Sequence, residues 1–241
     1  IYSSWQNHEL CYATSDLPDR DFVFGGTIVS NGDVGYHGRS EKDRLNMTGT
    51  THGSIECING QWYVFYHRLT HKSDYSRQAC AEPITILPDG SIPQVEITSC
   101  GLNGKPLHGT GTYPAVIACN ITNGHMPHGS NKIYTDSFPN ATHCGEDRFI
   151  GEIQDGTMLG YKYFAFSGAK EVGVQYRGSC NGKFVVSDDM DGKNIVAEIP
   201  VAPADAWTET RASLHISDGT HPLYLFYRGD GEAAVKELYL A

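Results

Sequence analysis

The segment Asn59-Gly60-Gln61-Trp62-Tyr63-Val64-Phe65-Tyr66-His67 joins a turn signal to a strand signal. Asn and Gly tolerate the positive φ that a tight two-residue hairpin requires. The residues that follow are rich in aromatic and β-branched types, which favour strands. We therefore predict a hairpin turn at residues 59–60 and a strand over Gln61–His67. Its aromatic rings are expected to lie in the core, on both sides of a sheet.

The same combination recurs along the chain. Asn-Gly or Asp-Gly pairs begin at positions 31, 59, 89, 103, 123, 155, 181, 191, 218 and 230. Between them lie further short runs of strand-forming residues, namely Tyr161–Phe166, Val172–Tyr176, Asn194–Ile199, Leu223–Tyr227 and Val235–Leu240. Sustained apolar spacing of the helical kind is missing from every window of about 12 residues. The pattern predicts an all-β protein with hairpin turns at the Asn-Gly and Asp-Gly pairs and little helix.

Composition excludes two classes of protein. The 241 residues include 18 basic and 28 acidic side chains, which leaves a formal net charge of −10. Binding to a phosphate backbone needs clustered Lys and Arg, so we expect no nucleic-acid partner. The longest apolar runs, such as Ala115–Cys119, are far shorter than the roughly 18 residues of a membrane span, so we expect no membrane partner either.

The seven cysteines are scattered, and none forms a C-x-x-C pair. A structural zinc site needs close pairs of ligands, so we expect none. We predict instead that most of these cysteines are buried as small hydrophobic residues in a reducing compartment. Their positions are Cys11, Cys57, Cys80, Cys100, Cys119, Cys144 and Cys180.

A Gly-rich stretch divides the chain. Residues Leu107–Thr112 lack apolar periodicity and carry several Gly and Thr residues, so we place the domain boundary there. A second loop-like stretch, Asn123–Gly145, is longer and polar, and composition alone allows a boundary at that point as well.

The residues by themselves do not single out a catalytic centre. His52 stands before a Gly at the start of a predicted strand, where a histidine is more often structural than catalytic. Acidic residues are plentiful, yet no local pair marks a general acid and base. Glycoside hydrolysis uses two carboxylates that are usually distant in sequence, so it stays open. A purely structural role stays open too.

Residues 1–107 resemble the last part of the catalytic domain of family 43 glycoside hydrolases, which are five-bladed β-propellers. The resemblance rests on the order and spacing of four pieces, namely Ile1–Ser4 with Leu10–Ser15, Thr51–Ile55, Gly60–His67 and Tyr75–Ile84. The chain opens at Ile1 inside a strand-like stretch, so we expect it to have been cut from a longer protein.

The resemblance implies several site residues. His52 matches a family histidine near the propeller axis that helps to hold a calcium ion or its water shell, and water-mediated contact suits a hard cation better. Arg77, six residues before Pro83, matches a family arginine that reaches the sugar, and Trp5 is a further substrate-binding candidate. The family's catalytic Asp and Glu residues belong to earlier blades. We therefore assign no catalytic residue and expect no hydrolysis by this chain alone.

Residues 113–241 resemble family 6 carbohydrate-binding modules, which are β-sandwiches. Three segments carry this resemblance, namely Tyr113–Cys119 as a first strand, Asp155–Phe164, and Gly219–Phe226. Modules of this class commonly stack sugars on a Trp that faces a second aromatic residue across a loop-end cleft. Trp207 falls near that Trp, whereas the expected asparagine near the C-terminus is missing, so Trp207 is either a stacking platform or a structural anchor.

Together these patterns predict an all-β chain, a partial five-bladed propeller over 1–107 followed by a jelly-roll sandwich over 113–241. The implied function is a fragment of an inverting α-L-arabinofuranosidase or β-xylosidase that acts on arabinoxylan, xylan or arabinan oligosaccharides. The alternative is a non-catalytic carbohydrate-binding or scaffold protein. Localisation, cytoplasmic or secreted, stays open.

Overall fold

The computed structural model describes residues 1–4, 9–129 and 132–241 and is almost entirely β. The described residues form eighteen strands and four single 3-10 turns, and no α-helix occurs among them. The 3-10 turns are η1 (Tyr36–Gly38), η2 (Glu41–Asp43), η3 (Gly101–Asn103) and η4 (Ala115–Ile117). The prediction of an all-β protein with little helix is thus confirmed. Within the described residues, no helix has the length and apolar character needed to cross a membrane.

The chain divides into two compact units. The first comprises Ile1–Ile97 and His125–Tyr134, and the second comprises Thr98–Gly124 and Thr135–Ala241. Residues 98–107 therefore lie with the second unit, although the sequence assigns them to the first domain. Part of the polar stretch Asn123–Gly145, namely His125–Tyr134, belongs to the first unit. There the backbone of Thr48 forms hydrogen bonds with the backbone of Pro127 and of Gly129. The functional division at residues 107–113 remains a prediction.

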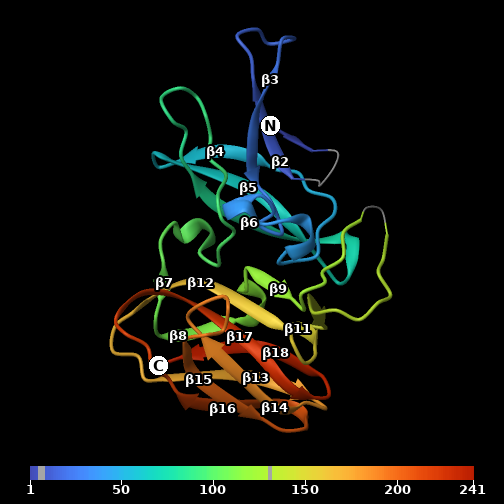
Figure 1. The fold of residues 1–241 in the computed structure, drawn as a ribbon, viewed down its shortest axis with the longest axis vertical. Helices are drawn as coiled ribbons and strands as arrows, with labels where there is room; N and C mark the ends of the chain where they lie inside the picture. Colours follow the sequence, from blue (N-terminus) through green and yellow to red (C-terminus); the bar gives the residue numbers. More distant parts are fainter. Residues whose placement is uncertain (5–8, 130–131) are drawn as a thin grey trace. The chain divides into compact units, whose positions relative to one another are not determined.

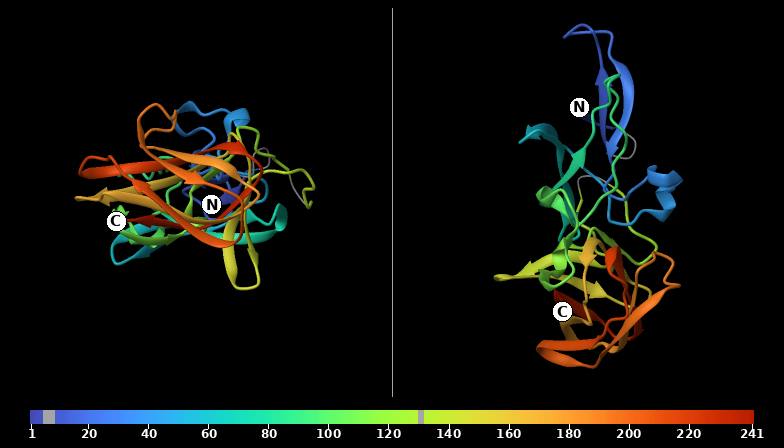
Figure 2. Two further views of the ribbon diagram at one scale, coloured as in Figure 1. Left: turned by 90° about the horizontal axis from the view of Figure 1, so that it is seen from below. Right: turned by 90° about the vertical axis from the view of Figure 1, so that its left-hand side faces the viewer.

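The first unit contains two three-stranded antiparallel sheets, each in chain order (Figure 1). Figure 2 shows β2 and β3 of the first sheet side by side as a hairpin, in blue. The second sheet contains the predicted hairpin, whose turn residues Asn59 and Gly60 both have positive φ, as the sequence requires. The strands are β1 (Tyr2–Ser3), β2 (Leu10–Thr14), β3 (Val23–Val29), β4 (Ser54–Ile58), β5 (Gln61–Thr70) and β6 (Ser73–Ile84).

The aromatic strand β5 is only partly buried. Tyr63 and Tyr66 lie in the core as predicted, with exposed fractions of 9% and 7%. Trp62, by contrast, is 39% exposed, so the prediction of a core position is wrong for this residue. The reason is its place at the turn end of the β4–β5 hairpin, where Trp62 pairs with the exposed Cys57.

The second unit is a β-sandwich of two six-stranded sheets (Figure 1). One sheet has the order β10-β11-β18-β13-β16, with β8 paired to β18, and the other has the order β15-β14-β17-β12-β7, with β9 paired to β12. The strands are β7 (Leu107–His108), β8 (Gly111–Pro114), β9 (Asn120–Thr122), β10 (Asn140–Cys144), β11 (Asp147–Ile153), β12 (Met158–Phe166), β13 (Glu171–Gly178), β14 (Asn181–Ser187), β15 (Ile195–Val201), β16 (Ala204–Ser213), β17 (Gly219–Asp230) and β18 (Ala233–Leu240).

The sandwich encloses one contiguous hydrophobic core. Alternate residues of both sheets point into it, including Val172 and Val174 on β13 and Phe184 and Val186 on β14, all with 0% exposure. This alternation is the period that the sequence predicts for strands with one buried face. All five strands predicted within residues 161–240 are confirmed.

Three predictions about local structure are wrong. Tyr113–Cys119 is not one strand, because β8 ends at Pro114 and η4 then carries the chain to the opposite sheet. Most Asn-Gly and Asp-Gly pairs do not close hairpins, since only the pairs at 59 and 191 lie between adjacent paired strands. Only three of the seven free cysteines are buried, namely Cys11, Cys119 and Cys180.

Candidate functional site

An open pocket of about 340 Å³ in the first unit brings together two residues predicted from the sequence. His52 and Arg77 both line it, although β4 and β5 separate them along the chain. The other lining residues are Gly53, Phe65, Tyr66, His67 and Ala79. His67 was not predicted as a site residue, because the sequence pattern indicated only that it ends a strand.

Antiparallel pairing of β5 with β6 builds this pocket. His67 lies opposite Ala79, and Arg77 stands two residues before Ala79 on β6. In a sheet such diagonal positions share one face, so the imidazole and the guanidinium point to the same side. The register alone therefore explains why Arg77 reaches the pocket.

Gly53 explains how His52 enters the pocket from the neighbouring strand. A Cβ atom at position 53 would overlap the carbonyl oxygen of Phe65 on β5. Only glycine allows this close approach of two backbones. The ring of His52 consequently packs edge-on against His67, with centroids 4.6 Å apart.

The surroundings of His67 determine its tautomer and its charge. Its Nε2 lies 2.9 Å from the carbonyl oxygen of Thr50, and since a carbonyl only accepts, Nε2 carries the proton. Burial, followed by the neighbouring His52 and Arg77, lowers the pKa of His67 to about 4. His67 is therefore neutral near pH 7. Arg77 donates a longer hydrogen bond of 3.4 Å from Nη2 to the Thr50 hydroxyl.

A buried polar pair lies behind the pocket. The hydroxyl of Tyr66 donates to Oε1 of Glu82 over 3.2 Å, and both side chains are buried. Burial and the adjacent Glu82 raise the pKa of Tyr66 well above its usual value. Such a pair holds β5 and β6 in register beneath the lining residues.

The described lining of the pocket carries hydrogen-bonding nitrogen groups and aromatic rings. Its described lining offers a guanidinium, two imidazoles and the ring of Phe65, but no carboxylate. Hydrolysis of a glycosidic bond by a general acid and base needs two carboxyl groups. The pocket can therefore bind a hydroxyl-rich ligand, but by itself it lacks the groups that would cleave one.

Calcium does not fit the described residues alone. A calcium ion takes six to eight oxygen ligands, whereas the pocket presents nitrogen and cationic groups around His52. Among the described residues, no cluster of three or more His, Cys, Asp or Glu side chains has the arrangement of a metal site. The predicted calcium therefore depends on oxygen ligands from elsewhere.

The other two predicted sugar-binding residues differ in what is known of their surroundings. Trp5 lies outside the described residues. Trp207 lies within β16, a strand of the sandwich, rather than on a loop. Its Nε1 donates to Oδ2 of Asp147 over 2.9 Å, and its ring contacts Phe149 and Arg177.

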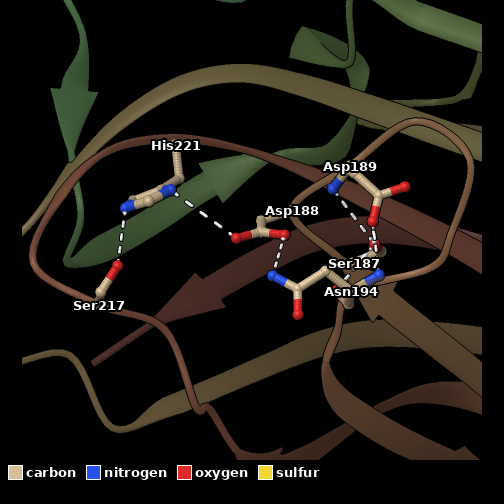
Figure 3. A network of polar contacts seen from close by, with 6 residues as sticks. All are labelled: Ser187, Asp188, Asp189, Asn194, Ser217 and His221. Carbon is tan, nitrogen blue, oxygen red and sulfur yellow. Dashed lines mark hydrogen bonds and ion pairs between the residues drawn. The ribbon is translucent and has the colours of Figure 1, made fainter.

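A second polar cluster in the sandwich places a serine, a histidine and an aspartate in series (Figure 3). Nε2 of His221 lies 3.2 Å from the hydroxyl of Ser217, but Nδ1 lies 3.8 Å from Oδ2 of Asp188. The longer distance exceeds a hydrogen bond, and the other Asp188 oxygen accepts from Asn194. The cluster therefore ties the β14–β15 loop to β17, and we assign it no catalytic role.

Comparison with known proteins shows that the chain is related to a carbohydrate-active protein. No family model matches it. A xylosidase/arabinosidase of Thermoclostridium stercorarium is 44% identical over 254 aligned residues, which cover 100% of this chain and 52% of the relative. The chain thus spans about half the length of that relative. A xylosidase/arabinosidase of Bacteroides ovatus is 36% identical over 66 aligned residues, which cover 27% of this chain and 16% of that relative.

One solved structure shares the fold over most of the chain. A family 43 arabinoxylan arabinofuranohydrolase from Bacillus subtilis, in complex with cellotetraose, aligns with 97% of this chain and 47% of its own. The TM-score is 0.52 at 18% sequence identity. Over its whole length, then, this chain is a homologue of a xylosidase/arabinosidase and shares the fold of part of a family 43 glycoside hydrolase chain.

Proposed function

We propose that this chain is a fragment of an inverting glycosidase of the α-L-arabinofuranosidase or β-xylosidase type. Its substrates would be arabinoxylan, xylan or arabinan oligosaccharides of plant hemicellulose. The observation that carries the proposal is the shared pocket of His52, His67 and Arg77 in a homologue of a xylosidase/arabinosidase. The xylosidase/arabinosidase activity of that relative supports the reaction class, and this chain spans about half of the relative's length.

Arg77 is proposed to bind the sugar. The guanidinium is the permanently charged group among the described lining residues, and His67 beside it is neutral. Its planar N–H groups can donate to two neighbouring sugar hydroxyls at once. The ring of Phe65 adds an apolar surface to the same pocket, which suits the C–H face of a pentose.

The first unit is proposed to supply the last blades of a five-bladed propeller. Its two three-stranded sheets, each in chain order, support this arrangement because propeller blades are antiparallel sheets connected in sequence. The catalytic Asp and Glu residues would then come from the part of the longer protein that this chain does not span. For the same reason, any calcium near His52 would need oxygen ligands from that part, with His52 bonding to its water shell.

Two proteins test the proposal, namely this chain and the same chain extended upstream to the length of its relative. We expect the extended protein to release 4-nitrophenol from the α-L-arabinofuranoside or the β-xyloside, and this chain to release none. Turnover by this chain alone, or none by the extended protein with either substrate, would contradict the proposal.

The role of Arg77 is tested in the extended protein. Arg77→Ala should lower kcat/KM by about 100-fold, because it removes a charge-assisted double hydrogen bond to the substrate. The matched control is Arg20→Ala in the same unit, since Arg20 is exposed and its ion pairs with described residues are to the adjacent Asp19 and Asp21. Equal activity of both variants would remove Arg77 from the site.

A further inference from the structure

Five half-buried side chains form a cluster on one face of the sandwich, outside the pocket described above. We call it the Arg177 cluster, and it comprises Asp147 and Phe149 on β11, Arg177 on β13, Trp207 on β16 and Lys236 on β18. All five belong to the sheet of order β10-β11-β18-β13-β16. Arg177 directly follows the buried Tyr176, and Lys236 directly follows the buried Val235, so both side chains lie on the face turned away from the core.

The two aromatic rings meet across the sheet. Strands β18 and β13 separate β11 from β16, yet the rings of Phe149 and Trp207 lie edge to face with centroids 5.5 Å apart. The guanidinium carbon of Arg177 is 4.4 Å from the centroid of the Trp207 ring and 5.3 Å from that of Phe149. Arg177 is thus held in one place by two aromatic surfaces, at little cost in conformational entropy on binding.

The charges of the cluster are unequally satisfied. Asp147 uses both carboxylate oxygens, one accepting from Lys236 over 2.6 Å and one from Trp207 over 2.9 Å. The hydrogen bonds from Lys236 and Trp207 lower the pKa of Asp147, which keeps it ionised. Arg177 makes no hydrogen bond or ion pair with another described residue, so its N–H groups are available. One net positive charge is left locally on a chain whose net charge is −10.

We infer that the Arg177 cluster binds a carboxylate-bearing sugar, a uronic acid carried on a xylan chain. The carboxylate would pair with the fixed guanidinium, and the pyranose would pack its C–H face on the Trp207–Phe149 pair. Charge complementarity selects an anion, and the aromatic pair selects a flat, partly apolar one. The choice of a xylan as carrier rests on the proposed function, whereas the site itself lies in the second unit and does not involve Arg77.

Calorimetry on this chain tests the inference with two xylo-oligosaccharides of equal length, one with a glucuronic acid substituent and one without. We expect the acidic oligosaccharide to bind at least about tenfold more tightly, and the difference to shrink as salt rises. Arg177→Gln should remove about tenfold of that affinity, because the charged pair is lost. Equal affinity for both sugars, or equal binding of poly-glutamate, would overturn the inference.

The matched control is Arg211→Gln on the same sheet. Arg211 also lies over an aromatic ring, that of Tyr239, but it is already paired with Glu209 and Glu171. The Arg211→Gln variant should therefore bind the acidic oligosaccharide with unchanged affinity. If Arg177→Gln lowers the melting temperature, Arg177→Lys provides the second variant, which should keep part of the affinity. Loss of affinity in Arg211→Gln equal to that in Arg177→Gln would contradict a specific site.

The inference about the Arg177 cluster and the proposed function can be contradicted independently of each other. The binding experiment uses this chain and needs no hydrolysis, whereas turnover is measured on the extended protein. Tight binding of the acidic sugar without turnover would overturn only the proposed function. Turnover with no preference for the acidic sugar in binding would overturn only the role of the Arg177 cluster.

Discussion

The two units bury different kinds of residue. The second unit holds the contiguous hydrophobic core, to which both six-stranded sheets contribute. Most of the buried polar and charged side chains that the structure describes lie in the first unit, among them His67, Arg68, Asp74 and Glu82. The first unit also exposes the apolar run Phe22–Phe24, with exposed fractions of 60%, 67% and 62%.

This difference separates stability from recognition. An apolar core gains free energy from every buried side chain, whereas a buried polar group must find a hydrogen-bond partner to avoid a penalty. We infer that the second unit is the more stable of the two and that the first gives up stability to position its pocket. An exposed apolar run on the first unit also invites self-association, and a monodisperse monomer of this chain in light scattering would count against that expectation.

The largest effect is expected in the sandwich core. Phe184→Ala removes a ring with 0% exposure that packs on Tyr227 at a centroid distance of 5.4 Å. Truncation of a buried Phe costs about 3–5 kcal/mol of unfolding free energy, because it loses burial and leaves a cavity. Urea denaturation measures this, with Ile195→Ala, 52% exposed, as control. A loss below about 1 kcal/mol would contradict the division between the units.

Acidification should act on the first unit. The unfolded chain protonates His67 near pH 6.5, whereas the folded chain resists until about pH 4. The stabilisation from neutral His67 is therefore complete above pH 6.5 and is lost as the pH falls toward 4, by at most about 3 kcal/mol. Denaturation curves at pH 7 and pH 4.5 would show the loss, and His67→Gln should make it smaller. A variant with unchanged pH dependence would exclude His67 as the cause.

Backbone contact at the pocket gives the next effect. Gly53→Ala forces a Cβ against the Phe65 carbonyl, so β4 must move away from β5 and carry His52 with it. Overpacking of this kind costs about 1–3 kcal/mol. Thermal melting measures it, and Ser54→Ala, one residue along on an exposed position, is the control. Equal melting temperatures for the two variants would show that the approach of the strands is not tight.

Calcium should give the smallest effect. Because the described residues offer no oxygen cage around His52, added calcium should leave the melting temperature of this chain unchanged. Magnesium at the same concentration serves as control. A melting temperature that rises with calcium but not with magnesium would show that this chain itself supplies calcium ligands.

Local sequence signals predicted elements better than connections. The Asn59-Gly60 pair closes a hairpin because its two strands are neighbours in one sheet. Asp155-Gly156 and Asp230-Gly231 have equally good turn chemistry, yet each joins strands of opposite sheets. Positive φ permits a turn, but it does not say which strand will pair with which. That choice depends on the core.

The candidate site was predicted in part. His52 and Arg77 were found through resemblance to a family, and the structure brings both to one pocket. His67 was missed because a single histidine at a strand end has no distinguishing pattern. Its position opposite Ala79, diagonal to Arg77, would have revealed it, but that register belongs to a pairing of β5 with β6 that no local signal specifies.

The sequence by itself determined the class of fold, five of the strands of the sandwich and the small amount of helix, because periodicity and residue preference act over a few neighbours. The tertiary structure decided which sheet each strand joined and which side chains met. Gly111–Pro114 pairs with Glu237–Leu240, although most of the sequence of the second unit lies between these two segments. The ring of Phe149 contacts that of Trp207, although two strands lie between β11 and β16 in the sheet. Contacts of such long range follow from burying one common core, and no short stretch of sequence contains that information.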